Sequence, residues 1–134
     1  MMLVDFESLP KVARESMNQY HKEEVDIINQ LYRACKEGNT EEIDRALAVF
    51  LDHIEEHFSH EEELMRKVNF FAYPMHKAEH DSVRAHISQL YRDWGKHKNP
   101  QSILKFLEEF FINWLFSHIS TMDTVTAQHV GEGV

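Results

Sequence analysis

At 134 residues the chain has the length of one domain, and a chain of this size can bury one core without disulfides. Apolar residues make up 43%, which excludes a disordered chain, and the net charge of −9 argues against binding to nucleic acid or to an anionic membrane. No apolar run approaches the roughly 20 residues of a membrane span, and the N-terminus lacks the pattern of a signal peptide. We therefore expect one domain over residues 1–134, located in the cytoplasm.

The first predicted helix runs from about Asn18 to Glu37, and Gly38 stops it. Residues spaced by three and four form its inner stripe: His21, Val25, Ile28, Tyr32 and Cys35. Because Cys35 lies on this stripe, we expect a buried and unreactive thiol. Residues 3–16 contain scattered apolar side chains and predict an N-terminal arm that packs on the bundle.

The second predicted helix opens with Asn39 as its cap and acids in its first turn, and it ends near Arg66. Its inner stripe contains Ile43, Leu47, Phe50, Ile54, His57, Glu61 and Leu64. The connection that follows is short, because Pro74 suits the first turn of a third helix. Gly95 is expected to end that third helix. Its inner stripe contains His76, His80, Val83, Ile87, Leu90 and Trp94.

The fourth predicted helix begins with Asn99 as cap and Pro100 as first helical residue. Its stripe contains Leu104, Leu107, Phe111, Trp114 and His118, and a short tail is expected from Thr124. Helices joined by short loops favour an all-α, antiparallel up-down-up-down four-helix bundle with the N-terminal arm beside it. In that topology the start of the first and third helices and the end of the second and fourth lie at one end of the bundle.

The histidines on the inner stripes all fall at this one end. Polar side chains in one core layer are costly unless they satisfy each other or bind something, and a metal is the simplest compensation. The candidate ligands are His21, His57, Glu61, His76, His80, His118 and Asp123. Five imidazoles and two carboxylates exceed one tetrahedral zinc site and suit two metals bridged by carboxylates. Imidazole serves zinc, copper, iron and nickel, so the ligand types alone leave the metal open.

Asp123 requires an irregular backbone to join this set. It follows His118 by five residues, which is about 140° around a regular α-helix. We therefore predict that regular helix ends or loosens between Ile119 and Met122.

Taken alone, each pair of candidate ligands spaced by four residues could also be polar side chains on the edge of a helix rather than metal ligands. His53, one turn from His57, is the strongest rival ligand, whereas His60 is off the stripe and either supports the site or faces solvent. The remaining histidines are expected on the surface: His86, His97 and His129. The acidic runs at residues 23–24 and 61–63 are expected to be solvated, apart from Glu61.

The order and spacing of these residues resemble the hemerythrins, particularly bacterial single-domain members. The matching pattern is His21, then His57-Phe58-Ser59-His60-Glu61-Glu62, then His76-x-x-x-His80, then His118-Ile119 with Asp123. The resemblance covers nearly the whole chain. It implies a four-helix bundle that holds a non-heme, oxo- or hydroxo-bridged di-iron centre and binds O2 for carriage, storage or delivery.

By this resemblance, His76, His80 and His118 hold one iron. His21 and His57 hold the other, which keeps an open position, while Glu61 and Asp123 bridge the two. The resemblance also implies a ligand pocket lined by Glu24, Val25, Phe58, Trp114 and Ile119.

Glu24 departs from the leucine that many bacterial members carry three residues after the first histidine. Pointing inward, it would bind the iron beside His21 or hold a proton there; alternatively it points to solvent beside Glu23. An inward carboxylate favours peroxide chemistry or faster autoxidation over storage of O2. The first rival to O2 carriage is therefore a di-iron oxidase or peroxidase acting on O2, peroxide or nitric oxide. The second rival, independent of Glu24, is an O2- or iron-sensing module.

Overall fold

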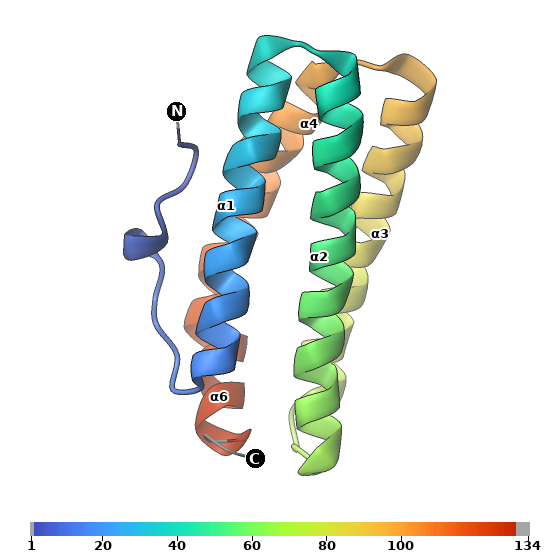
Figure 1. The fold of residues 1–134 in the computed structure, drawn as a ribbon. Coiled ribbons are helices and arrows are strands. Elements are labelled where there is room, and N and C mark those ends of the chain that lie inside the picture. Colours follow the sequence, from blue (N-terminus) through green and yellow to red (C-terminus); the bar gives the residue numbers. More distant parts are fainter. Residues whose placement is uncertain (1, 131–134) are drawn as a thin grey trace.

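Four helical rods lie side by side in the computed structural model, which describes residues 2–130 (Figure 1). The first three are α1 (Glu15–Glu37), α2 (Thr40–Lys67) and α3 (Tyr73–His97). The fourth rod is built from consecutive segments: α4 (Pro100–Lys105), η2 (Phe106–Phe111), α5 (Ile112–His118), η3 (Ile119–Asp123) and α6 (Thr124–Val130). Successive rods run in opposite directions, and no strand occurs within residues 2–130. The predicted all-α up-down-up-down bundle is confirmed.

Local sequence signals explain most of the helix ends. The Asn39 side-chain oxygen accepts a hydrogen bond from the Glu42 backbone N–H at 3.1 Å, so it caps α2 as predicted. Gly38 ends α1 in the left-handed region at φ 74°. The prediction that Gly95 ends α3 is wrong. The helix continues to His97, and Lys98 adopts the left-handed conformation at φ 48°.

The fourth rod is longer and less regular than predicted. Its η2 and η3 segments are π-helical, with hydrogen bonds that reach five residues back instead of four. The prediction of a short tail from Thr124 is wrong for residues 124–130, because these residues form α6. Helix continues there because no glycine or proline occurs before Gly131. The last part of that predicted tail, residues 131–134, lies outside the described residues.

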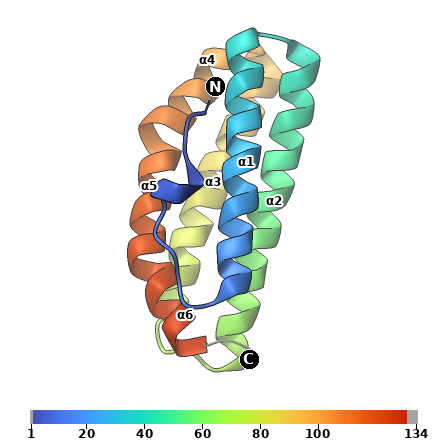
Figure 2. The same ribbon diagram turned by 60° about the vertical axis from the view of Figure 1, so that its left-hand side comes forward.

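The N-terminal arm runs alongside α1 and the fourth rod (Figure 2). It contains one short 3₁₀ turn, η1 (Phe6–Ser8), and buries Val4, Leu9 and Val12 against the bundle. The Asn29 side chain holds it by accepting from the Leu3 N–H at 2.7 Å and donating to the Val4 carbonyl at 2.8 Å. The predicted packing of the arm is therefore confirmed. No described helix is long and apolar enough to cross a membrane.

Candidate metal centre

One polar layer interrupts the apolar interior near the end of the bundle where α2 turns into α3. α1 supplies His21, and α2 supplies His57 and Glu61. α3 supplies His76 and His80, α5 supplies His118 and η3 supplies Asp123. Each of these seven side chains is at most 1% exposed. The structure thus brings together every metal ligand that the sequence suggested.

The π-helical segment η3 is what carries Asp123 into the layer. Regular α-helix stops at His118 and resumes at Thr124. Because a π turn takes up one extra residue, a position five residues after His118 returns to the same face. The Thr124 hydroxyl also donates to the Ile119 carbonyl at 2.6 Å, which supports this turn. The loosened helix lies where the five-residue spacing predicted it.

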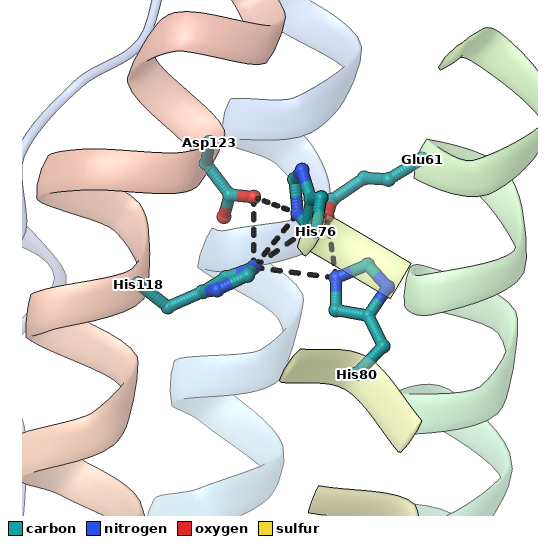
Figure 3. A group of neighbouring side chains, drawn as sticks. All are labelled: Glu61, His76, His80, His118 and Asp123. Atoms are coloured by element: carbon teal, nitrogen blue, oxygen red, sulfur yellow. Dashed lines mark hydrogen bonds and ion pairs between the residues drawn. The ribbon is translucent and has the colours of Figure 1, made fainter. Parts of the chain in front are cut away.

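One group of five side chains converges on a small volume (Figure 3). It comprises Glu61, His76, His80, His118 and Asp123. The Nε2 atom of His118 lies 2.9 Å from that of His76 and 3.2 Å from that of His80. Asp123 Oδ1 lies 3.1 Å from the Nε2 atoms of both His76 and His118. Glu61 Oε1 completes the group at 3.2 Å from His80 Nε2.

A second group shares both carboxylates with the first. It comprises His21, His57, Glu61 and Asp123, and within each group all ligand atoms lie within 4.8 Å of one another. Asp123 Oδ2 lies 3.0 Å from His21 Nε2, and Glu61 Oε2 lies 2.7 Å from His57 Nε2. Each carboxylate therefore presents one oxygen to each group. This arrangement suits a carboxylate that bridges two cations.

The chemistry of this layer fits metal ions better than hydrogen bonding alone. Glu61 Oε1 and Asp123 Oδ1 are buried and make no hydrogen bond to the described residues. Buried oxygens without partners are costly, and a cation takes up their lone pairs. The three Nε2 atoms of the first group also face one another rather than separate acceptors. Imidazole nitrogens converge in this way around a shared ion.

The electrostatics of the layer keep its carboxylates in the form that binds cations. Burial and the neighbouring Glu61 would raise the pKa of Asp123, but His118 and His21 outweigh them and lower it. Burial would likewise raise the pKa of Glu61, but His57 and the other imidazoles hold it well below the usual range. Burial would lower the pKa of His118, yet Asp123 and Glu61 raise it to about 10. Protons therefore compete with metal for this imidazole.

Comparison with known proteins points to the same chemistry. Residues 12–129 match the family model described as the hemerythrin HHE cation binding domain. The chain belongs to the hemerythrin family. It is 43% identical over 131 residues to a bacteriohemerythrin of Aquifex aeolicus, with 98% of this chain and 100% of that protein covered. A bacteriohemerythrin of Methylococcus capsulatus is 30% identical over 103 residues, 77% of each chain.

Solved structures support the same fold. The crystal structure of a hemerythrin carrying a single substitution superposes with a TM-score of 0.86 at 24% identity, covering 97% of this chain and 98% of that chain. At that identity the likeness speaks for the fold alone. It agrees with the hemerythrin bundle that the sequence predicted.

Two of the predicted pocket residues, Phe58 and Trp114, stack on candidate ligands of this hemerythrin-family chain. The Phe58 ring stacks on His80 with centroids 4.0 Å apart and an interplanar angle of 1°. The Trp114 ring stacks on His118 at 4.4 Å, and it is half-buried. Val25 and Ile119 are buried. The two ring contacts place Phe58 and Trp114 beside candidate ligands.

The rival histidines lie outside both groups of ligand atoms. His53 is buried, and its Nε2 atom lies 3.3 Å from Glu23 Oε2. His60 is half-buried and interacts with Ser16 Oγ at 3.2 Å. The other three, His86, His97 and His129, are exposed as predicted. Cys35 is buried as predicted, and burial raises the pKa of its thiol to about 11.

Two residues of the acidic runs are buried: Glu62, which was expected to be solvated, and Glu24, for which both alternatives were open. Glu24 is 0% exposed, which contradicts its solvent-facing alternative, and Glu24 belongs to neither group of ligand atoms. Its Oε1 atom lies 2.8 Å from His57 Nδ1, on the side of the ring away from the second group. Glu62 is 6% exposed and lies 2.8 Å from His80 Nδ1. Both carboxylates are buried because each has a histidine ring nitrogen as partner.

Further residues that the sequence reasoning missed hold the rings of His118 and His76. Glu79 Oε1 lies 2.7 Å from His118 Nδ1, and Thr126 Oγ1 lies 2.8 Å from His76 Nδ1. Such contacts orient metal-binding imidazoles and fix which nitrogen faces the metal. Glu79 lies three residues after His76 and one before His80, so the sequence carried only a weak signal for it.

Proposed function

We propose that this hemerythrin-family protein holds two iron ions in a non-heme centre and binds O2 there. His76, His80 and His118 would hold one ion, and His21 and His57 the other. Glu61 and Asp123 would bridge them. The observation that carries the proposal is that both carboxylates present one oxygen to each of two histidine groups. The names of the two bacteriohemerythrin relatives support the same assignment.

The two groups differ in the number of imidazoles, and this difference suits ligand binding at one ion. The first group offers three imidazoles and the second only two. With both carboxylates shared, the ion in the second group has fewer protein ligands and keeps a position for a small molecule. When bound, a ferrous pair supplies the two electrons that reduction of O2 to the level of peroxide requires.

The Phe58 ring lies beside candidate ligands of both groups, with its centroid 4.0 Å from that of His80 and 5.5 Å from that of His57. Phe58 and Ile119 are fully buried, and the Trp114 ring covers His118. A dry, apolar surround suits a small uncharged ligand such as O2 and strengthens each electrostatic interaction inside it. This is the role that we assign to the pocket residues.

A second candidate is a di-iron oxidase or peroxidase that turns over O2, peroxide or nitric oxide. The buried Glu24 carboxylate, 2.8 Å from His57 Nδ1, favours it because it places an extra negative charge behind a ligand of the more open ion. A stable O2 adduct supports carriage or storage, whereas continuous consumption of O2 or peroxide supports the enzyme. A sensing module would respond to O2 or iron without consuming either.

The first test is metal analysis combined with a visible-light spectrum of the purified protein, deoxygenated and then aerated. We expect two irons per chain and a reversible spectral change on aeration. A single zinc at full occupancy would end the di-iron assignment.

The ligand assignment in α2 is tested by matched substitutions. His57→Ala should lower the iron count, because His57 Nε2 faces the second group. His53→Ala and His60→Ala are controls on the same helix and should each retain two irons, since neither side chain belongs to a ligand group. Loss of iron from His53→Ala with retention in His57→Ala would refute the assignment.

A further inference from the structure

The Nδ1 atoms of the candidate ligand imidazoles, which point away from the metal groups, differ in the groups that they contact. When Nε2 faces the metal groups, Nδ1 carries the proton and donates it to whatever lies behind the ring. His57 donates to Glu24, His80 to Glu62 and His118 to Glu79, all at 2.7–2.8 Å. In contrast, His76 meets the neutral Thr126 hydroxyl, and His21 Nδ1 has no hydrogen-bond partner among the described residues.

The three outer carboxylates differ in how far their charge is compensated. Glu62 also accepts a hydrogen bond from Arg84 Nη1 at 2.8 Å, so a guanidinium balances it. The Glu79 side chain is 36% exposed, so water and salt screen its charge. Glu24 is 0% exposed, and its Oε2 atom has no hydrogen-bond partner in the described chain. The least compensated outer charge therefore lies behind His57.

The groups around Glu24 come from α1 and α2. His53 Nδ1 is 3.5 Å from Glu24 Oε1, and its Nε2 atom faces the exposed Glu23. Among the described residues, Glu24 forms ion pairs with His53 and His57 and with no lysine or arginine. Glu24 thus has one close, well-formed hydrogen bond, and it points at the back of a candidate metal ligand.

An anion behind a ligand imidazole changes the metal in front of it. The hydrogen bond from Nδ1–H to a carboxylate makes the imidazole a stronger electron donor and fixes its orientation. A buried negative charge also stabilises the more highly charged metal through space, and it does so most where water is absent. Both effects favour ferric over ferrous iron.

We propose that Glu24 is a positioning residue for His57, and that it lowers the reduction potential of the iron held by His21 and His57. This inference rests on the proposed di-iron function. The uncompensated charge of Glu24 lies behind a ligand of only one iron. That iron, which has fewer imidazole ligands, would therefore be the one more strongly stabilised in the ferric state. The centre is then suited to giving up electrons rather than to long storage of a reduced form.

The test measures the midpoint potential of the iron-loaded, full-length protein and of two variants. Glu24→Gln keeps the shape and a hydrogen-bond acceptor but removes the charge, and Glu24→Leu removes both. We expect two irons in each and a higher potential in both variants. At a fixed applied potential the ratio of ferric to ferrous iron should fall by roughly tenfold, taking the lower end of the effect that lost outer contacts have on metal affinity or activity.

Glu79→Gln is the matched control, because Glu79 makes the same kind of contact with the buried His118 but is itself 36% exposed. Its potential should shift less than that of Glu24→Gln. An unchanged potential in both Glu24 variants, with two irons bound, would overturn the proposal. Loss of one iron from Glu24→Gln would also overturn it, because the carboxylate would then hold the metal rather than tune it. Absence of an iron pair from the unsubstituted protein would instead refute the di-iron function.

Discussion

At the end of the bundle where α1 turns into α2, the interior is filled by apolar side chains. They include Phe50, Trp94, Ile103, Leu104 and Leu107, all buried. At the other end the same four rods enclose five imidazoles and two carboxylates, which are buried as fully as the apolar side chains. The same four rods run through both ends (Figure 1), so the difference lies in the side chains and in the π-helical η3 that brings Asp123 inward.

The two ends must therefore gain their stability differently. Burying apolar surface contributes about 25 cal/mol per Å² and needs no ligand. A buried layer of ionisable groups loses hydration, and it recovers that loss only through well-matched partners. This protein therefore has an apolar end that folds on packing and a polar end whose stability depends on what it binds.

The largest expected effect follows from removing iron. Chelation under anaerobic conditions should lower the free energy of unfolding by more than the roughly 3–5 kcal/mol that breaking one buried ion pair costs, because several ligands lose their partner together. Thermal unfolding of the loaded and chelated protein measures this.

Hydrogen exchange locates the effect within the bundle. Protection should fall at the start of α1, in η3 and in α6, and it should persist around Phe50 in α2. Equal loss of protection at both ends would contradict the division between them.

A smaller effect is expected from a cavity at the apolar end. Phe50 is 0% exposed and meets Phe111 edge-on at 5.2 Å. Phe50→Ala should lower the free energy of unfolding by about 3–5 kcal/mol and leave the iron count at two. Val49→Ala is the matched control, since Val49 is exposed, and it should be nearly neutral. Iron loss from Phe50→Ala alone would show that the two ends are coupled.

The predictability of the two ends also differs. Helical spacing located the apolar stripes, because an α-helix repeats its faces every three to four residues. The same spacing located the candidate ligands and even the irregular turn before Asp123, since a five-residue separation fits no regular face. It did not reveal η2, because Leu107 and Phe111 have ordinary helical spacing.

The histidine partners of Glu24 and Glu62 were not predictable in the same way. Glu24 and Glu62 stand in acidic runs whose composition is typical of solvated faces. Each is buried because a histidine on another helix turns its Nδ1 atom toward it, and such a pairing depends on tertiary packing. Likewise, Gly95 suggested a helix end, whereas α3 actually ends at the left-handed Lys98.

The smallest expected effect concerns Gly95 itself, near the apolar end. It lies inside α3, and a Cβ atom there would have no neighbour within 4 Å. Gly95→Ala should raise the free energy of unfolding by about 0.5–1 kcal/mol, because alanine loses less backbone entropy in a helix.

Gly38→Ala is the matched control: its Cβ is equally free of neighbours, but the backbone stands at φ 74°. A left-handed conformation costs alanine about 1–2 kcal/mol, so this variant should be less stable. Thermal unfolding of both variants measures the pair, and each should keep two irons because neither glycine approaches the metal layer. Destabilisation by Gly95→Ala would mean that α3 does not continue through this position in solution.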